Sequence, residues 1–279
     1  MNSRLKQVEL GERFRSLHQR KNAFIIPNPW DLGTARLLAQ LGFEALATTS
    51  MGYAFSSGQR DNTLSREQVM KHIAEIVSVT NLPVSADLEK GYGDAPGAVA
   101  ETIKLAAAAG AVGGSIEDAT GRADRPIFDL EEAVDRIRAA VESARSLPFA
   151  FTLTARAENY LHGRPDLKDT IKRLQAYQEA GADVLYAPGL ASEEDVASVV
   201  KSVDRPVNVV MGLQGVQLSL NALSALGVKR VSVGSALYRT ALGAFLRAAR
   251  EMRENGTFTF AKQAATAAEI TATFKIESA

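Results

Sequence analysis

The chain of 279 residues contains no cysteine. That absence excludes disulfide bonds, thiolate metal sites and cysteine nucleophiles. Histidine is scarce as well, and His18, His72 and His162 show no spacing typical of metal ligands. Metal sites built from sulfur or imidazole are therefore not expected.

An excess of charge of one sign is also missing, since 32 basic residues balance 32 acidic residues. A chain without a basic field does not attract nucleic acid or an anionic membrane, and we expect neither as a partner. No apolar run is long enough to span a bilayer, and the polar segment 1–6 lacks the apolar core of a signal peptide. The sequence therefore predicts a cytoplasmic protein.

A repeated unit organises the chain. An amphipathic stretch ends at a glycine and a short β-rich run follows, which happens at Gly42, Gly110, Gly181 and Gly227. Each glycine is predicted to end a helix in a left-handed conformation. Further β-rich runs begin at or near a proline. The expected strands are 23–27, 43–49, 83–87, 111–117, 148–156, 182–187, 206–210 and 228–233.

The stretches between these strands carry helix signals. Ser65 with Gln68, and Asp129 with Glu132, have the spacing of a capping box ahead of an apolar face. Strands that alternate with helices in a chain of this length favour an α/β fold, a single (β/α)8 TIM barrel with extra N- and C-terminal helices. A doubly wound open sheet is the competing architecture.

The same organisation predicts one domain over residues 1–279. Residues 255–279 fall outside the repeat and are rich in alanine and threonine. We expect them to form a C-terminal helical extension that packs on the barrel or on a neighbouring subunit.

Acidic residues stand at the C-terminal ends of two expected strands, the ends that form the active face of a barrel. Asp87 and Glu89 are one residue apart in a strand-like run, so their side chains are predicted to point to the same side. Glu117 ends the next strand, and Asp118 should face away from it. Carboxylates that meet repel unless a cation lies between them, and oxygen ligands suit Mg²⁺. The predicted metal ligands are Asp87, Glu89 and Glu117, although such residues can also cap helices or lie in solvent.

Other polar residues at the strand ends are suited to an anion. Arg156 can hold a carboxylate or phosphonate through two hydrogen bonds, or it can pair with Glu158. Segment 48–52 has small side chains that let backbone N–H groups approach an anion, but it can equally be an ordinary turn. His162 follows the fifth strand and can reach the same face, and Asn208 lies at the end of the seventh.

Several of these motifs together are familiar. They are Asn-Pro-Trp-Asp at 28–31, Thr-Thr-Ser at 48–50, Asp-Leu-Glu-Lys-Gly-Tyr-Gly at 87–93, Ser-Ile-Glu-Asp at 115–118 and Thr-Ala-Arg at 154–156. The combination resembles the isocitrate lyase/phosphoenolpyruvate mutase superfamily, and its 2-methylisocitrate lyase-like members in particular. The resemblance spans about residues 24–246.

The resemblance implies an Mg²⁺-dependent enzyme that stabilises the enolate of a 2-oxo acid, typically pyruvate, while a C–C or P–C bond beside it breaks or forms. It implies that Asp87 binds the metal directly and that Glu89, Glu117 and Asp61 hold metal-bound waters. Without the resemblance, Asp61 would be a solvated loop acid.

The resemblance also implies how a small carboxylate substrate binds. Arg156 matches the family arginine that contacts substrate, and it is, with Asp61, a predicted catalytic residue. Thr49, Ser50 and the Met51 amide resemble the loop that holds the substrate carboxylate. The predicted substrate-binding residues are Thr49, Ser50, Met51, Arg156 and Asn208.

The loop after the fourth strand departs from the family. Lyases place a Lys-Arg/Lys-Cys-Gly-His element there and mutases a lysine and an asparagine, whereas segment 119–128 of this chain has neither. We therefore expect a carbon–carbon lyase that acts on a small 2-oxo or 2-hydroxy carboxylic acid and needs only enolate stabilisation. An enzyme that processes phosphonopyruvate or phosphoenolpyruvate, and a non-catalytic 2-oxo-acid binder, are the alternatives.

The resemblance extends to assembly. The family commonly forms dimers of dimers in which the eighth barrel helix is exchanged between subunits. We therefore expect a homo-oligomer, a dimer or a tetramer.

Overall fold

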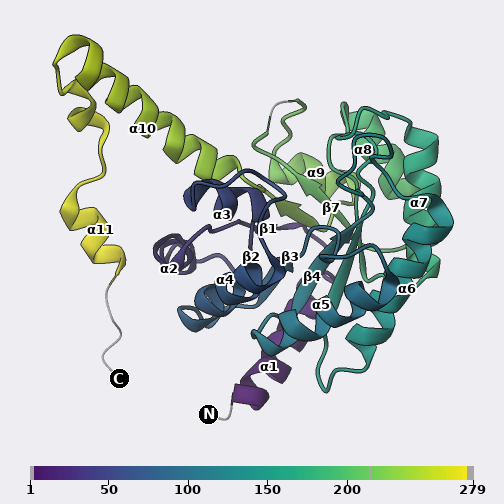
Figure 1. Ribbon diagram of the computed structural model, residues 1–279. Coiled ribbons are helices and arrows are strands. Elements are labelled where there is room, and N and C mark those ends of the chain that lie inside the picture. The colour runs from purple at the N-terminus through teal and green to yellow at the C-terminus, as the bar shows by residue number, and fades with distance from the viewer. Residues whose placement is uncertain (1–2, 214, 275–279) are drawn as a thin grey trace.

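Eight parallel strands form the centre of the molecule (Figure 1). The computed structural model describes residues 3–213 and 215–274. The strands pair in the order β1-β8-β7-β6-β5-β4-β3-β2, so the first strand pairs with the last. They are β1 (Phe24–Ile26), β2 (Leu46–Ala47), β3 (Val84–Asp87), β4 (Gly113–Glu117), β5 (Thr152–Arg156), β6 (Val184–Tyr186), β7 (Val207–Val210) and β8 (Arg230–Ser232).

The barrel closes between β1 and β2, where the backbone N–H of Ala47 donates to Pro27 O at 3.0 Å. The Asn28 side chain strengthens this seam. Its Nδ2 donates to Thr48 O at 2.9 Å, and its Oδ1 accepts from two backbone N–H groups that follow β8. The predicted (β/α)8 barrel is confirmed, and the alternative of an open doubly wound sheet is wrong.

Helices alternate with the strands and surround them (Figure 1). In the described part of the chain, no helix combines the length and apolar character needed to cross a bilayer. The helices are α1 (Ser3–Leu17), α2 (Leu32–Gln40), α3 (Ser50–Ser56), α4 (Arg66–Ser78), α5 (Pro96–Ala108), α6 (Leu130–Arg145), α7 (Leu167–Glu179), α8 (Glu193–Lys201), α9 (Leu220–Leu226), α10 (Ala236–Asn255), the 3-10 helix η1 (Thr259–Gln263) and α11 (Ala267–Thr273).

The predicted helix ends are confirmed with one exception. Glycines at the repeat positions have positive φ, for example 85° at Gly42 and 99° at Gly110, as a left-handed helix end requires. Ser65 and Gln68 form the predicted capping box at the start of α4. Asp129 precedes α6, but its side chain caps nothing because it pairs with Arg125 at 2.6 Å.

Helix α1 covers the end of the barrel at which the strands begin. The ring of Phe14 packs against the start of β4, so that a Cβ added to Gly113 would lie 2.7 Å from it. A Cβ added to Gly11 would lie 2.4 Å from the carbonyl oxygen of Ala150. Phe14 and Leu17 are buried. The N-terminal helix is therefore part of the packed core, at the face opposite to the strand C-termini.

Replacing Gly11 by alanine is expected to destabilise the protein. The new Cβ would lie 2.4 Å from Ala150 O, a backbone atom that cannot turn aside. Overpacking costs about 1–3 kcal/mol, which is more than the gain of about 1 kcal/mol that alanine normally brings to a helix. Urea denaturation measures the free energy of unfolding. In the control Gly243→Ala the nearest atom is the flexible end of Arg247 at 3.4 Å, so equal effects at both positions would contradict this packing.

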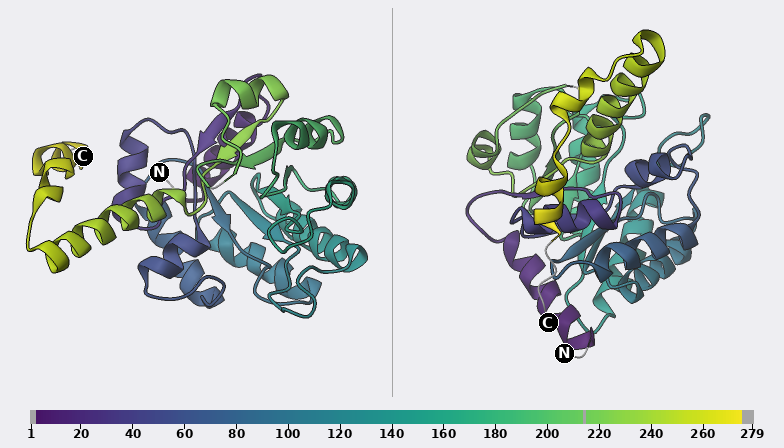
Figure 2. Two further views of the ribbon diagram at one scale, coloured as in Figure 1. Left: turned by 90° about the horizontal axis from the view of Figure 1, so that it is seen from above. Right: turned by 90° about the vertical axis from the view of Figure 1, so that its left-hand side faces the viewer.

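The C-terminal segment leaves the barrel. Helix α10 extends away from the strands, and the chain then turns back through η1 to α11 (Figure 2). Helix α11 contacts α2, and Phe274 reaches the α2 residue Gly33. The helical extension predicted for 255–279 thus contains helix and touches the barrel, while residues 275–279 lie outside the described residues.

Candidate active site

A cavity of about 350 Å³ opens at the C-terminal ends of the strands, the face on which such barrels carry active sites. The strand register places Asp87 beside Ser115 and Glu117 beside Arg156. Glu89 does not line the cavity. The sequence-predicted residues that do line it are Thr49, Ser50, Met51, Asp61, Asp87, Glu117, Arg156 and Asn208.

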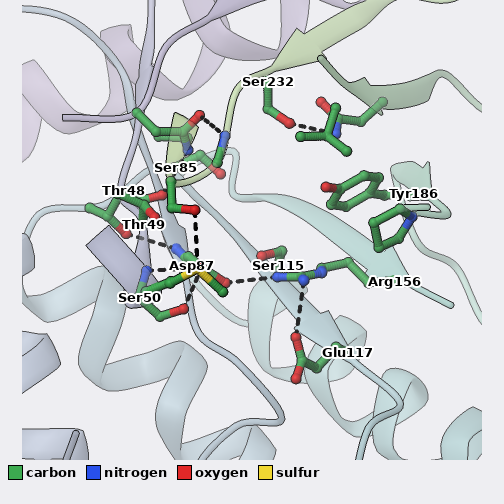
Figure 3. Close-up of a pocket in the computed structure, with 18 of the residues that line it drawn as sticks. Thr48, Thr49, Ser50, Ser85, Asp87, Ser115, Glu117, Arg156, Tyr186 and Ser232 are labelled. Atoms are coloured by element: carbon green, nitrogen blue, oxygen red, sulfur yellow. Dashed lines mark hydrogen bonds and ion pairs between the residues drawn. The ribbon is translucent and has the colours of Figure 1, made fainter. Parts of the chain in front are cut away.

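Asp87 is the central carboxylate of this cavity (Figure 3). One of its oxygens accepts from the backbone N–H of Ser50 at 3.0 Å and from the Ser50 hydroxyl at 2.8 Å. The other oxygen pairs with Nη1 of Arg156 at 2.9 Å. The Asp87 backbone N–H donates to the Thr48 hydroxyl at 2.8 Å, so β2 and β3 fix this side chain together.

Arg156 lies between Asp87 and Glu117 and reaches both (Figure 3). Its Nη2 is 3.2 Å from Glu117, and its Nε donates to Glu158 at 2.8 Å. Its guanidinium carbon lies 5.2 Å from the ring centre of Tyr186. The sequence left open whether Arg156 faces a ligand or pairs with Glu158, and the structure shows that it lines the cavity and makes that pair as well.

Burial and the neighbouring charges shift the pKa values of Arg156 and Glu117 in opposite directions. Burial by itself would lower the pKa of Arg156, but Glu158, Glu117 and Asp87 raise it well above its usual value. Burial raises the pKa of Glu117 well above its usual range, against the opposing effect of Arg156, and burial likewise raises that of Glu158. The guanidinium is therefore the fixed charge of the site, whereas burial favours the protonated forms of Glu117 and Glu158 and Arg156 opposes this effect.

Asp118 points away from the cavity, as predicted. It accepts from Tyr177 at 2.5 Å and from Arg173 at 3.1 Å, and its second oxygen accepts from the backbone N–H of Glu158 at 2.8 Å. Asp118 thus joins α7 to the segment that follows β5. It positions Glu158 rather than facing a ligand.

Glu89 does not lie where the strand pattern predicts. Strand β3 ends at Asp87, and the backbone at Glu89 is left-handed with a φ of 47°. The alternation of faces along a strand therefore does not extend to Glu89. Nor do three or four carboxylates meet in one cluster, because the guanidinium of Arg156 lies between Asp87 and Glu117. In residues 3–213 and 215–274, no three His, Cys, Asp or Glu side chains form a ready-made metal-binding group.

The oxygen atoms around Asp87 nevertheless fit a hydrated cation. Asp61 Oδ1 and Glu89 Oε1 are buried and have no hydrogen-bond partner within the described residues. Buried polar atoms without partners are rare and often mark the place of a water or an ion. After burial, the charges of Asp87 and Asp61 raise the pKa of Glu89, so the three carboxylates act on one another. Carboxylates of this kind suit Mg²⁺, which commonly keeps several of its waters.

The raised pKa of Glu89 predicts that folding stability and metal binding depend on pH. Its pKa is raised to about 8 by burial and by Asp87 and Asp61, so the metal-free folded state holds this proton more tightly than the unfolded state. The stability that this proton contributes is complete below the ordinary pKa of 4.5 and is lost as the pH rises towards 8. Metal binding requires the ionised form, and Mg²⁺ should therefore bind more tightly at pH 8 than at pH 6 and release protons.

Calorimetry in two buffers of different ionisation enthalpy measures these protons. The variant Glu89→Gln is expected to release fewer protons and to remove the loss of stability between pH 5 and 8. Glu101→Gln, on the exposed side of α5, is the control and should behave as the wild type. Proton release that is the same in all three proteins would contradict the role of Glu89.

The predicted carboxylate-binding loop forms the start of a helix and also lines the cavity. The Thr49 hydroxyl accepts from Gly52 N at 3.2 Å, which is an ordinary N-cap for α3. The sulfur of Met51 accepts from the Ser235 hydroxyl at 3.1 Å. Ser50 alone of the three hydrogen-bonds to Asp87. The interpretation of this segment as an ordinary turn therefore explains the contact of Thr49. Ser50 is the residue that connects the loop to Asp87.

Sequence reasoning missed several residues of the cavity wall. Tyr186 ends β6 and faces Arg156, whereas His162, which the sequence indicated could reach this face, does line the cavity from the segment after β5. Residues two positions before the predicted side chains also line it, such as Ser85 before Asp87 and Ser115 before Glu117. Alternation along the strands is the signal that could have identified them, because residues i and i−2 share a face.

The loop after β4 does not contribute to the cavity. None of residues 119–128 lines it, and Ala119 pairs with Ile127 in a small antiparallel bridge. Lys90 Nζ donates to Thr120 O at 2.7 Å and holds the loop against the turn after β3. The segment in which the resemblance implies a cysteine element for lyases is therefore held by its own contacts and does not line the cavity.

Comparison with known proteins agrees with this fold. The chain matches the phosphoenolpyruvate phosphomutase family over residues 14–253. It is 32% identical over 205 residues to 2-methylisocitrate lyase of Escherichia coli (strain K12), covering 71% of this chain and 68% of that protein. It is 31% identical over 258 residues to oxaloacetate decarboxylase of Pseudomonas aeruginosa (strain LESB58), covering 90% and 88%. A crystal structure of a candidate lyase/mutase from Burkholderia cenocepacia J2315 has 66% identity, a TM-score of 0.95 and 98% coverage of both chains.

The barrel, with its acidic and arginine-containing cavity at the strand C-termini, is that of a superfamily that includes the phosphoenolpyruvate phosphomutase family, 2-methylisocitrate lyase and oxaloacetate decarboxylase. The chain belongs to the phosphoenolpyruvate phosphomutase family, within the isocitrate lyase/phosphoenolpyruvate mutase superfamily. The resemblance seen in the sequence is thereby confirmed.

Proposed function

We propose that this protein is an Mg²⁺-dependent carbon–carbon lyase that acts on a small 2-oxo or 2-hydroxy carboxylic acid through an enolate intermediate. The observation that supports this most is the pairing of Asp87 with Arg156 at the cavity, beside the unpartnered buried oxygens of Asp61 and Glu89. A cation site and a fixed positive charge thus lie next to each other, as an anionic 2-oxo acid and its enolate require.

Each residue has a proposed role. Asp87 would bind Mg²⁺ directly, and Asp61, Glu89 and Glu117 would hold its waters. When bound, the ion supplies Lewis-acid polarisation of the 2-oxo group. Arg156 would hold the substrate by its carboxylate and stabilise negative charge that develops beside it, and Ser50 and the Met51 backbone would orient the carboxylate. Asn208 forms the deeper cavity wall.

The type of lyase follows from what the cavity wall contains. Among the described residues, the wall has no part of segment 119–128, and the chain has no cysteine to serve as an acid. A reaction that needs only enolate stabilisation fits this wall better than cleavage of a methylisocitrate. The relative named oxaloacetate decarboxylase supports such a reaction, because loss of CO₂ from a 2-oxo diacid leaves an enolate. His162 and Tyr186 are among the wall residues that could return a proton to it.

Incubation of the purified protein with a panel of acids tests this proposal. The panel contains oxaloacetate, 2-oxo-4-hydroxy acids, substituted malates and 2-methylisocitrate, each with Mg²⁺ or with a chelator. We expect Mg²⁺-dependent release of pyruvate or glyoxylate from at least one diacid. Binding of these acids without any turnover would instead identify a non-catalytic 2-oxo-acid binder.

Phosphonate chemistry is the second candidate, and the family match favours it, because that family is named for phosphoenolpyruvate phosphomutase. Arg156 could hold a phosphonate as it could a carboxylate. Phosphorus NMR of the protein mixed with phosphonopyruvate or phosphoenolpyruvate distinguishes the two reactions. A new phosphorus signal that depends on Mg²⁺ would favour the mutase or hydrolase.

We also propose that α10 packs on the barrel of a second copy, in a dimer or tetramer. Within the described residues, α10 buries only Ala236 and exposes Leu237, Phe245, Leu246 and Met252. An amphipathic helix that follows β8 but lies off its own barrel leaves an apolar face to be covered. Light scattering should give a dimer or tetramer, and Phe245→Glu should shift it towards monomer. A wild-type monomer would contradict the proposal.

A further inference from the structure

Arg230 begins β8 and points into the barrel, where it lines the deep part of the cavity with 5% of its surface exposed. Its Nε donates to Asn208 Oδ1 at 2.8 Å, and its Nη2 donates to the Thr154 hydroxyl at 2.9 Å. Its Nη1 lies 3.4 Å from Nε2 of His18. A guanidinium has more N–H groups than these three acceptors use.

His18 is a neutral partner. Its Nδ1 lies 2.9 Å from the Phe14 carbonyl, which can only accept, so Nδ1 carries the proton and Nε2 accepts from Arg230. Burial and the charge of Arg230 lower the pKa of His18 to about 3. The ring therefore orients the guanidinium without adding or removing charge.

In the part of the chain that the structure describes, the hydrogen-bond partners of Arg230 are all neutral and no carboxylate pairs with it. Among residues 3–213 and 215–274, the ionisable group that acts on it is Tyr186, whose own pKa is raised by burial, so that the phenol stays protonated. Burial lowers the pKa of Arg230 to about 10, and the guanidinium is still charged at neutral pH. A buried charge without a counter-ion is costly, and proteins normally pair such a group.

Two other buried arginines, Arg173 and Arg136, differ from Arg230 in their partners and in their location. Arg173 pairs with Asp118 and Asp169, and Arg136 donates to backbone carbonyls of the turn after β3. Neither of them lines the cavity. Arg230 is thus the buried arginine that faces the cavity with neutral partners.

The cavity around Arg230 is polar where barrels are usually filled by branched apolar side chains. Hydroxyl groups of Ser85, Ser115 and Ser232 line it together with Tyr186 and Asn208. Ser232 accepts from Asn208 Nδ2 at 3.0 Å and so fixes the amide that in turn accepts from Arg230. The floor is therefore an ordered group of donors around one unbalanced positive charge.

We propose that Arg230 binds a second acidic group of the ligand, so that the protein selects dianionic 2-oxo acids over monoanionic ones. This inference rests on the proposed function, in which the first carboxylate of the ligand is held at Asp87, Ser50 and Arg156. The second carboxylate supplies the counter-charge that the barrel floor lacks, and the remaining N–H groups of Arg230 donate to it.

Matched pairs of 2-oxo acids test the selectivity. Oxaloacetate is compared with 2-oxobutyrate, and 2-oxoglutarate with 2-oxovalerate, since each pair differs in whether a carboxylate or a methyl group ends the chain. Affinity in the presence of Mg²⁺ is measured by calorimetry, or as KM for an acid that is turned over. We expect the better diacid to bind at least about tenfold more tightly than its monoacid partner, as a buried charge pair allows.

The variant Arg230→Met should bring this diacid-to-monoacid ratio close to one, a loss of at least about tenfold. Asn208→Asp is a second variant that keeps the arginine but places a carboxylate next to its Nε. It should raise the melting temperature of the ligand-free protein and lower the same ratio. Lys229→Met is the control, because Lys229 donates to the carbonyls of Arg20 and Lys21 outside the barrel and should keep the ratio.

The outcomes separate this inference from the proposed function. If the wild type binds neither acid of either pair, the proposed function fails and takes the inference with it. If it binds both acids of each pair equally well, or if Arg230→Met and Asn208→Asp keep the wild-type ratio, the inference is overturned and the proposed function stands. If Arg230→Met does not fold, the wild-type ratio and Asn208→Asp decide.

Discussion

Replacing Asp87 by asparagine is expected to lower turnover by about a thousandfold or more and to weaken Mg²⁺ binding by at least about 10- to 100-fold. The shape of the side chain is kept, but its charge is lost. A bound metal ion supplies several kcal/mol of stabilisation to the charge that develops during reaction, and a loss of about 4 kcal/mol corresponds to a factor of about 10³. Mutation of groups that only support a ligand already costs 10- to 100-fold in metal affinity. Calorimetry with Mg²⁺ and a product assay measure the two effects.

The matched control is Asp94→Asn. Asp94 is an exposed carboxylate in the turn after β3 that pairs with Lys90 at 2.7 Å. It should keep both metal affinity and turnover, because an exposed ion pair contributes little. An Asp87→Asn protein with wild-type Mg²⁺ affinity would place the cation elsewhere and remove the main support of the proposed function.

Replacing Arg156 by methionine is expected to reduce both stability and activity. The change leaves Glu117 and Glu158 buried without their cation, and breaking such a pair costs about 3–5 kcal/mol of stability. Loss of a fixed charge aimed at the reacting group should lower turnover by about 100- to 1,000-fold. Urea denaturation in the presence of a chelator measures the stability without the metal.

The pH dependence distinguishes a charge effect from a packing effect. The pKa of Glu117 is raised well above its usual range by burial even beside Arg156, and without Arg156 it should be higher still. Protonation then removes the unpaired charge, so the destabilisation of Arg156→Met should be smaller at pH 5 than at pH 8. An equal loss at both values would indicate packing alone. Arg138→Met, at an exposed pair with Asp135, is the control and should change little.

Features that depend on a few neighbouring residues could be predicted from the sequence. Each expected strand contains an observed strand, because a short β-rich run after a helix-ending glycine is a local pattern. The glycines themselves are confirmed, since a left-handed helix end selects glycine for steric reasons. Asp87, Glu117 and Arg156 were found for the related reason that strand ends in a barrel meet on one face.

Features set by backbone details or by distant partners could not be predicted. The strand pattern assumed an extended backbone up to Glu89, but the chain turns after Asp87 with positive φ at Glu89, Gly91 and Tyr92. Asp129 has the spacing of a cap, yet Arg125 competes for its carboxylate. No local pattern indicates these competing contacts.

Arg230 illustrates the same limit over longer separations. A single arginine within a β-rich run looks like a surface charge on an edge, and its partners come from β5, from β7 and from the turn after α1. Only the assembled barrel brings Thr154, Asn208 and His18 to the same guanidinium. Tyr186 and Ser232 were missed for this reason too, because their meaning depends on which strands become neighbours.

Helix α1 precedes the repeating units, yet the residue directly after it, His18, supplies the imidazole that orients Arg230. A change at the amino end of the chain would therefore be transmitted to the bottom of the ligand chamber without touching any residue at its mouth. Deleting the first helix, or anchoring it to a bulky fusion partner, would alter which acids the protein accepts as well as how stable it is. Under the role proposed for Arg230, the opening segment of the polypeptide takes part in ligand recognition as well as in the architecture that supports it.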